Sequence, residues 1–308
     1  MNILALKYAV EVAKTGSINK AALSLYVAQP NISRSIKELE NQLEITIFER
    51  TSKGMKLTAE GEQFISYARK ILKQLDEIED VFKNGRPNHH VFSISVPRAS
   101  YVSFALAEFS TRLSHLPECE IFYKETNSAR AIKNLLEHDF NLGVIRYAEQ
   151  HEKRFMDMFE EKKLQHEQIT AFQYVLIMSK DSPLAKLDVI RFDDLLEYIE
   201  IAHADPYVPS LPLSVVKKEE LLVDPHRKIY VYERASQFDV LAKNHLAFMW
   251  VSPVPALTLE RYGLVQRKCL DNKRLYKDVL VYEQSYHLSD LDKMFIDELL
   301  KAKHQYME

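Results

Sequence analysis

The chain has 308 residues, about twice the length of a typical single domain, so its length favours two or more folding units. Hydrophobic residues make up 46% and charged residues 28% of it, which excludes wholesale disorder, a collagen-like repeat and a membrane-embedded bundle. The net charge is −3, yet residues 1–59 hold eight Lys or Arg and five Glu, which gives +3. The front of the chain is therefore its basic part.

Signals for export, membrane insertion or metal binding are weak. Lys7, Glu11 and Lys14 interrupt the first apolar run, so no cleavable secretion signal is expected. The most apolar late stretch, residues 246–257, is shorter than the roughly 20 residues that a membrane span needs. The two cysteines are too few for a disulfide framework and have no histidines at metal-ligand spacing. We expect a cytoplasmic chain without a metal or cofactor.

Residues 1–58 are predicted to form three short helices followed by a β-hairpin. The first helix ends at Gly16, and Ser17 has the chemistry of an N-cap for the second. The third begins near Gln29 and Pro30, because proline in a first turn loses no hydrogen bond. Its spacing predicts that this third helix buries Ile32, Ile36, Leu39 and Leu43. Strands at 45–50 and 55–57, joined by a polar turn, would form a basic wing.

The opposite face of the third helix is polar and points outward. At about 100° per residue, this face and the helix start hold Gln29, Pro30, Ser33, Arg34, Lys37 and Asn41. Gln and Arg side chains can each make two hydrogen bonds to a base edge, so such a helix suits the DNA major groove. Phosphate contacts are expected from Ser33, Lys37, Arg50 and Lys53. On periodicity alone, a small helical subdomain with a solvated face is an equal alternative.

A long helix is predicted from residue 59 to about residue 83, because Gly85 and Pro87 follow it. Its apolar residues follow a 4-3-4-3-4 spacing, which is typical of a seam that faces a partner helix. These predicted dimerisation residues are Phe64, Ala68, Ile71, Leu75, Ile78 and Phe82. The alternative is an amphipathic helix that packs on its own body.

From residue 91 onward, short β-rich runs alternate with helix-patterned segments. Strands are predicted near 91–96, 120–123, 142–145, 174–178, 199–202, 229–232 and 279–282, and helices near 101–113, 129–137 and 236–243. Strand and helix alternation of this kind predicts parallel sheets covered by helices, here in two small α/β lobes.

A set of residues in the first 61 positions has the order and spacing of a known family. They are Gly16-Ser17-Ile18, Ala21-Ala22, Leu25, Val27, Gln29-Pro30, Ser33, Ile36, Leu39-Glu40, Leu43, Phe48, Arg50, Leu57-Thr58 and Gly61. In these residues the chain resembles the LysR-type transcriptional regulators. The resemblance implies a multidomain fold with a winged helix-turn-helix at 1–58, a dimerising linker helix at 59–86, and a two-lobed effector-binding domain at 91–308. That domain would be similar to periplasmic solute-binding proteins, with lobe I at about 91–165 and 267–308 and lobe II at about 166–266.

The chain departs from the family pattern at several places. Ala28 stands where the family usually has Ser, Glu44 where it has Gly, and Asn141 where it has Asp, while 244–247 lacks the expected glycine-rich turn. Because Ala28 removes a hydroxyl, the first-turn DNA contacts are assigned to Gln29 and Asn31. The full predicted DNA-binding set is Ser17, Gln29, Pro30, Asn31, Ser33, Arg34, Lys37, Arg50 and Lys53.

The effector site can be predicted from the general geometry of α/β sheets. Ligands bind beyond the carboxyl ends of strands, where loops and helix N-termini converge. This rule selects Arg98, Ser100, Tyr101, Thr126, Asn127, Ser128, Arg146, His203, Glu233 and Phe248. The hydroxyls and amides, with Arg98 and Arg146, favour a small anion such as a carboxylate. Alternatively, Arg98 is an ion-pair partner, and Asn127 and Ser128 only cap a helix.

Catalysis has little support, because no Gly-rich phosphate loop, nucleophile elbow or metal-binding His pair is found in the sequence. The leading hypothesis is a transcription regulator that binds double-stranded DNA as a homodimer or homotetramer and is controlled by a small-molecule effector between its lobes. The runner-up is a solute-sensing module whose helical front end serves dimerisation alone. An enzyme is the third and least favoured hypothesis.

Overall fold

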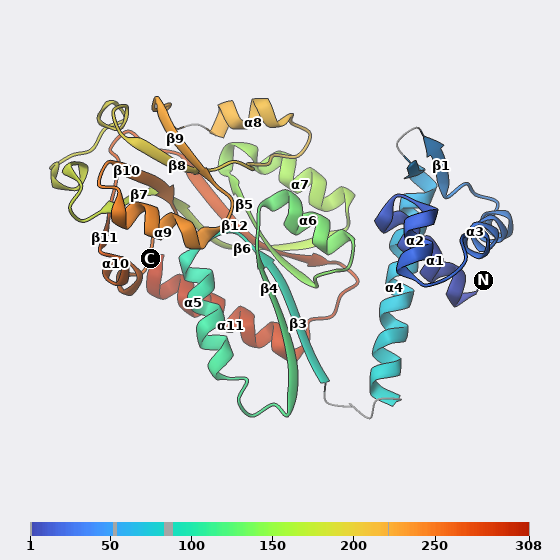
Figure 1. Cartoon of the computed structure of the whole chain (residues 1–308). Coiled ribbons are helices and arrows are strands. Elements are labelled where there is room, and N and C mark those ends of the chain that lie inside the picture. The colour runs from blue at the N-terminus through green and yellow to red at the C-terminus, as the bar shows by residue number, and fades with distance from the viewer. Residues whose placement is uncertain (1, 52–53, 83–88, 221, 308) are drawn as a thin grey trace. The chain divides into compact units, whose positions relative to one another are not determined.

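The computed structural model describes residues 2–51, 54–82, 89–220 and 222–307. The chain forms two compact units (Figure 1). The first is Met1–His89 with Leu136–His138, and the second is His90–Leu135 with Asp139–Glu308. Among the described residues, no helix is both long enough and apolar enough to cross a membrane.

The first unit begins with the three predicted helices, α1 (Ile3–Thr15), α2 (Ile18–Ser24) and α3 (Gln29–Leu43). Gly16 ends α1 in the left-handed conformation, and the Ser17 hydroxyl caps α2 by accepting the Lys20 N–H. Helix α3 buries Ile32, Ile36 and Leu39, as predicted. The prediction that Leu43 is buried is wrong: its side chain is 37% exposed, because α3 ends there and the chain reverses at Glu44.

Glu44 itself occupies a position that favours glycine. Its φ is +56°, in the left-handed region, where a side chain is disfavoured. The family resemblance places Gly at this position, and the backbone conformation gives the physical reason.

The wing is a short antiparallel hairpin of β1 (Phe48–Thr51) and β2 (Gly54–Leu57), with Phe48 opposite Leu57. The first strand begins at Phe48 rather than at residue 45. The Glu40 carboxylate accepts the N–H groups of Ile47 at 2.7 Å and Phe48 at 3.1 Å, which ties this part of the chain to the end of α3. The turn residues 52 and 53 lie outside the described residues.

The long helix α4 runs over Ala59–Phe82, close to the predicted bounds. The Thr58 hydroxyl caps it by accepting the Gly61 N–H at 2.9 Å, and the Thr58 N–H donates to the Ile47 carbonyl at 3.1 Å. Near its start, Phe64 packs against the core of the N-terminal helices. Further along, Ile78 is 54% exposed.

In the described part of the second unit, one five-stranded sheet has the order β4-β3-β5-β12-β6. Its strands are β3 (His89–Val96), β4 (Glu118–Glu125), β5 (Leu142–Ala148), β6 (Leu164–Gln173) and β12 (Leu275–Glu283). Strand β3 is parallel to β5, whereas β12 is antiparallel to both β5 and β6, so the prediction of purely parallel sheets is wrong. Strand β6 escaped prediction because the residues after its Leu164, Gln165-His166-Glu167-Gln168, carry no apolar signal.

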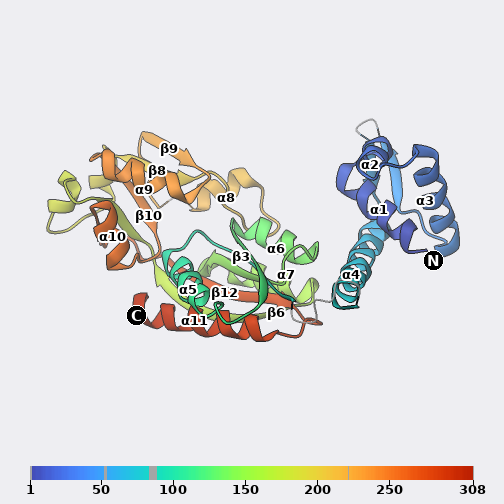
Figure 2. The same ribbon diagram turned by 60° about the horizontal axis from the view of Figure 1, so that its bottom comes forward.

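Helices cover both faces of this sheet, which defines lobe I (Figure 2). Helices α5 (Ser100–Thr111) and α11 (Asp290–Tyr306) lie on one face, and α6 (Ser128–Leu136) and α7 (Glu152–Glu161) on the other. Under α5 and α11, Phe92 packs against Phe109 and Phe295, with ring centroids 5.0 Å apart in each pair. The lobe therefore has an aromatic core of its own.

A second five-stranded sheet, with the order β11-β7-β10-β8-β9, defines lobe II. Its strands are β7 (Val175–Ser179), β8 (Ile199–His203), β9 (Arg227–Val231), β10 (Ala247–Val251) and β11 (Leu264–Arg267). Strand β8 is parallel to β9 and β10, and β7 is antiparallel to β10 and β11. Helices α8 (Leu213–Glu220), α9 (Arg234–Lys243) and α10 (Ala256–Tyr262) belong to this lobe.

The chain passes between the two sheets at Tyr174, after β6, and again at residues 268–274, between β11 and β12. The Asn272 side-chain amide donates to the Tyr174 carbonyl at 2.9 Å and joins the two crossings.

Candidate functional site

Helix α3 presents a polar face opposite the apolar residues that it buries. Of the predicted DNA-binding residues on it, Pro30, Asn31, Arg34 and Lys37 are exposed, while Gln29 and Ser33 are half-buried. Pro30 lies in the first turn of α3, where its missing N–H costs no helical hydrogen bond. Ala28, just before the helix, provides no side-chain cap. The predicted face is thus accessible over about the first two turns of the helix.

The remaining predicted DNA-binding residues lie on α2 and the wing. The Ser17 hydroxyl is engaged as the N-cap of α2, and Arg50 is exposed on β1. Lys53 lies outside the described residues. The sequence analysis did not select Tyr26, which is 96% exposed in the turn between α2 and α3 and has a φ of +53°. An aromatic residue between two helix-patterned segments, where the chain has to turn, was the sequence signal that could have identified it.

The predicted seam of α4 divides into two parts. Phe64 contributes to the core of its own domain, and Ala68 is 1% exposed. Ile71 and Leu75 are half-buried, and Ile78 is the most exposed of the described seam residues. The side chain of Phe82 lies outside the described residues.

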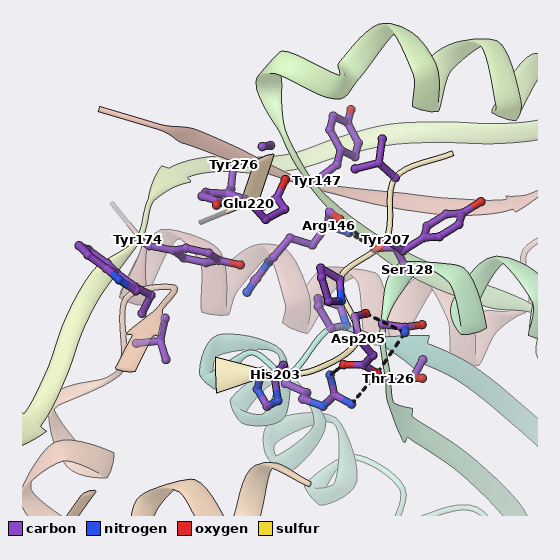
Figure 3. A pocket seen from close by; sticks show the side chains of 18 of the residues that line it. Thr126, Ser128, Arg146, Tyr147, Tyr174, His203, Asp205, Tyr207, Glu220 and Tyr276 are labelled. Atoms are coloured by element: carbon purple, nitrogen blue, oxygen red, sulfur yellow. Dashed lines mark hydrogen bonds and ion pairs between the residues drawn. The ribbon is translucent and has the colours of Figure 1, made fainter. Parts of the chain in front are cut away.

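Lobes I and II enclose a cavity of about 180 Å³ at the carboxyl ends of their strands (Figure 3). Six of the predicted effector residues line it: Arg98, Thr126, Asn127, Ser128, Arg146 and His203. They come from the segments that follow β3 and β4, from β5, and from the end of β8. The rule that ligands bind beyond strand ends therefore located a real cavity.

Both arginines of this cavity are held by carboxylates of the chain itself. The Arg98 guanidinium donates to both carboxylate oxygens of Asp205, at 3.1 and 3.3 Å. The Asn127 amide also donates to the Asp205 carboxylate, at 3.0 Å, and to the Asp205 carbonyl, at 2.9 Å. These bonds, drawn as dashed lines in Figure 3, join lobe I to the segment between β8 and α8 in lobe II.

Arg146 forms a second pair with Asp278 of β12, deeper in lobe I. Its Nε and one terminal nitrogen donate to the two carboxylate oxygens at 2.7 and 2.6 Å, and the Tyr101 hydroxyl donates to the same carboxylate at 2.7 Å. Burial alone lowers the pKa of the Arg146 guanidinium, but Asp278 outweighs burial and holds that pKa above its ordinary value. Arg146 is therefore a permanent cation whose charge is balanced inside the protein.

Four predicted effector residues do not line the cavity. Tyr101 is fully buried and donates to Asp278, and the Ser100 hydroxyl accepts from Arg234 at 2.7 Å. Glu233 is exposed at the start of α9. Phe248 is fully buried in the core of lobe II, because alternate residues of β10 face opposite sides of the sheet.

Asn127 and Ser128 serve local roles as well. The Asn127 side-chain oxygen accepts the Arg130 N–H at 2.8 Å and so caps α6. The Ser128 hydroxyl donates to the Arg146 carbonyl at 2.8 Å. Capping and lining of the cavity are therefore compatible for Asn127, whose amide nitrogen remains directed at Asp205.

The cavity also has an aromatic wall, of which the rule on strand ends selects only Tyr147, next to Arg146. The wall is made by Tyr147, Tyr174, Tyr207, Trp250 and Tyr276, together with the carboxylate of Glu220, which accepts from the Tyr276 hydroxyl at 3.1 Å. The Tyr174 and Tyr276 rings stack with centroids 4.0 Å apart. These residues come from separate segments, and apart from Tyr147 no local pattern marked them.

An adjoining cavity of about 430 Å³ extends the site into lobe II and shares Tyr174, His203, Trp250 and Tyr276. Burial raises the pKa of the Glu200 carboxyl there to about 7. Burial, followed by the nearby Arg98, lowers the pKa of the His203 imidazole to about 4, so His203 is neutral at pH 7. His203 thus adds no positive charge to the cavity.

The fold and the site define a class of protein in which a helix-turn-helix unit precedes a two-lobed α/β domain with a cavity between its lobes. Residues 3–62 match the family described as "Bacterial regulatory helix-turn-helix protein, lysR family". The HTH-type transcriptional regulator AlsR of Bacillus subtilis is 25% identical over 96% of this chain and 94% of AlsR. The regulator YofA of the same organism is 32% identical over 43% of this chain and 47% of YofA.

Two solved structures have the same fold over nearly the whole chain. Full-length OxyR from Pseudomonas aeruginosa has a TM-score of 0.59 at 16% identity and covers 98% of this chain and 94% of that one. Full-length LysG from Corynebacterium glutamicum, with bound effector Arg, has a TM-score of 0.59 at 15% identity and covers 100% of both chains. Residues 3–62 therefore form a lysR-family helix-turn-helix, and the whole chain is similar to transcriptional regulators of this kind rather than to enzymes. The predicted multidomain fold is confirmed.

Proposed function

We propose that this chain regulates transcription in the cytoplasm by binding specific double-stranded DNA sites, and that a small molecule in the interlobe cavity controls this binding. The polar face of α3 carries the proposal. Asn31, Arg34 and Lys37 are exposed on it, and Ile32, Ile36 and Leu39 anchor the opposite face in the domain core. A rigidly held helix with one polar face has the form that enters a major groove.

Arg34→Ala is the test of base recognition. If Arg34 contacts a base edge, the variant should bind the specific site about 1–3 kcal/mol more weakly while its binding to random DNA changes little. Lys37→Ala, one turn further along α3, should weaken both kinds of binding and reduce the salt slope by about one. The measurement is a fluorescence-anisotropy titration at several salt concentrations, with a specific site first selected by the purified protein from genomic fragments.

Lys153→Ala is the matched control, since it removes one exposed positive charge from α7 in the other unit. Its DNA affinity should equal that of the unchanged protein. Equal specific-site affinity for Arg34→Ala, Lys37→Ala and Lys153→Ala would contradict the proposed role of α3. That outcome would favour the solute-sensing module, in which the helical front end does not contact DNA.

We infer that the working unit is a homodimer or homotetramer joined through α4. Beyond Phe64 and Ala68, which its own unit buries, the helix keeps Ile71, Leu75 and Ile78 on the same 3.5-residue repeat. Ile78 is more than half exposed in the single chain, and a partner helix packed against it would bury this apolar side chain. A dimer would also place two copies of α3 on successive major grooves.

Leu75→Asp should weaken dimerisation by about a hundredfold or more. A symmetric dimer buries two copies of Leu75, and each contributes roughly 1.5 kcal/mol or more of apolar burial. Sedimentation velocity across a concentration series measures the change. Gln74→Asp places the same new carboxylate on an exposed neighbouring position off the seam and should leave the dimer intact. An unchanged dimer for Leu75→Asp would rule out this seam.

For the effector, we propose a small anion such as a carboxylate. Donors suited to a carboxylate line the cavity on the lobe I side: the Arg98 guanidinium, the Asn127 amide and the Thr126 hydroxyl. Since His203 is neutral and Arg146 is balanced by Asp278, Arg98 is the cation that such a ligand would meet in the cavity of about 180 Å³. Its present partner, Asp205, then determines how the ligand enters.

A further inference from the structure

The Asp205 carboxylate already occupies a complete carboxylate receptor. It receives two hydrogen bonds from the Arg98 fork and one from the Asn127 amide, at 3.0–3.3 Å. Paired N–H donors of arginine match the two oxygens of a carboxylate, so this arrangement would serve an external carboxylate equally well. The side chain of Arg98 is 12% exposed and that of Asp205 24% exposed, so solvent screens the pair only in part.

Asp205 differs from Asp278, the carboxylate that pairs with Arg146, in its freedom to leave. Asp278 is fully buried in the middle of β12, where the strands β5 and β6 hold its backbone on both sides. Asp205 lies instead in the segment between β8 and α8, where residues 204–212 form neither helix nor strand. Its side chain can therefore withdraw without breaking a sheet.

We propose that an anionic effector binds by exchange: its carboxylate takes the place of the Asp205 carboxylate on Arg98 and Asn127, and the segment between β8 and α8 is released from lobe I. This inference rests on the proposed function in taking the cavity as the effector site. Asp205 then competes with the effector for Arg98 and Asn127, so effector binding directly breaks this contact between the lobes. A ligand that replaces one contact of the two lobes with another has the differential affinity for two states that a switch requires.

A second contact keeps the lobes joined when Asp205 withdraws. Arg234 of α9 donates to the Ser100 hydroxyl at 2.7 Å, to the Ser103 hydroxyl at 3.1 Å and to Glu125 at 3.2 Å. These partners all belong to lobe I, and none of them lines the cavity. Exchange at Asp205 therefore breaks one polar link between the lobes and leaves others in place, among them the Arg234 bonds and the bond from the Tyr276 hydroxyl to Glu220.

The test measures binding of acetate to the full-length protein, with acetamide as its neutral counterpart of the same shape. Trp250 is the one tryptophan in the sequence and lines the cavity, so its fluorescence reports occupancy. Asp205→Ala removes the internal competitor and should tighten acetate binding by at least about tenfold at constant ionic strength, with little change for acetamide. Adding Arg98→Ala to that variant should abolish the gain.

Two further variants keep the test decisive. Asp205→Asn preserves the shape of the side chain if Asp205→Ala is unstable, and it should still tighten acetate binding about threefold or more because a neutral amide competes poorly for Arg98. Asp239→Ala removes an exposed carboxylate from α9, away from the cavity, and should change acetate affinity less than about twofold.

An unchanged acetate affinity in both Asp205 variants, or an equal gain for acetate and acetamide, would overturn the exchange. The experiment contains no DNA, so it is independent of the Arg34 titration. A gain specific to acetate together with failed DNA binding would sustain the exchange and reject the regulatory function. Specific DNA binding without tighter acetate binding in the Asp205 variants would support the regulatory function and reject the exchange.

Discussion

Asp278→Ala should lower the free energy of unfolding of the second unit by about 3–5 kcal/mol. The substitution leaves the Arg146 guanidinium, whose side chain is 11% exposed, without the carboxylate that receives its two bonds, and it leaves the buried Tyr101 hydroxyl without its acceptor. An unpaired buried cation costs far more than the pair contributes when intact. Urea unfolding followed by the fluorescence of Trp250, which lies in this unit, gives the value.

The double variant Arg146→Met with Asp278→Ala separates lost charge balance from lost packing. It should recover part of the stability that Asp278→Ala alone loses, since no buried charge then lacks a partner. Lys162→Ala, at an ion pair with Glu161 in which both side chains are exposed, provides the exposed reference and should cost less than about 1 kcal/mol. A loss below about 1 kcal/mol for Asp278→Ala would mean that Arg146 is balanced by some other group.

Gly61→Ala should destabilise the N-terminal unit by at least about 3 kcal/mol and abolish DNA binding with it. A methyl group at Gly61 would overlap the backbone carbonyl oxygen of Ile47 and lie 2.9 Å from its carbonyl carbon. That oxygen accepts the Thr58 N–H, and the Thr58 hydroxyl caps α4 at Gly61, so neither side can move without breaking the junction of wing and helix. Circular dichroism during heating would record the loss.

Glu62→Ala is the control for Gly61→Ala, because it changes the next residue of the same helical turn at an exposed position. It should alter stability by no more than about 0.5 kcal/mol. If Gly61→Ala unfolded at the same temperature as Glu62→Ala, the close packing of α4 against Ile47 would be incorrect.

Local patterns predicted the elements whose apolar residues repeat regularly. Helices α3 and α4 were located from their spacing, and β3 and β5 from short apolar runs bounded by polar residues. Strands β6 and β11 were missed because polar residues interrupt them. With β6 unrecognised, the antiparallel path through β12 was not expected, and the sheets were predicted to be parallel.

The location of the candidate site was predicted from the sequence, but the carboxylates that pair with its two arginines were not identified. The rule on strand ends selected Arg98 and Arg146, and both do line the cavity. Their partners lie 107 and 132 residues further along the chain, so no sequence window contains the pairs with Asp205 and Asp278. The alternative that Arg98 is an ion-pair partner is therefore correct, whereas the pairing of Arg146 was not expected, and only the folded chain identifies the two carboxylates.

The crossing at Tyr174 has a mechanical consequence. The Tyr174 ring lines both cavities and stacks on Tyr276, while its carbonyl is tied to the other crossing through Asn272. Rotations of one lobe about another are absorbed at a few such connecting residues. A change in the position of this ring would therefore act at the connection between the lobes, where a small rotation produces a larger displacement at the far edge of lobe II.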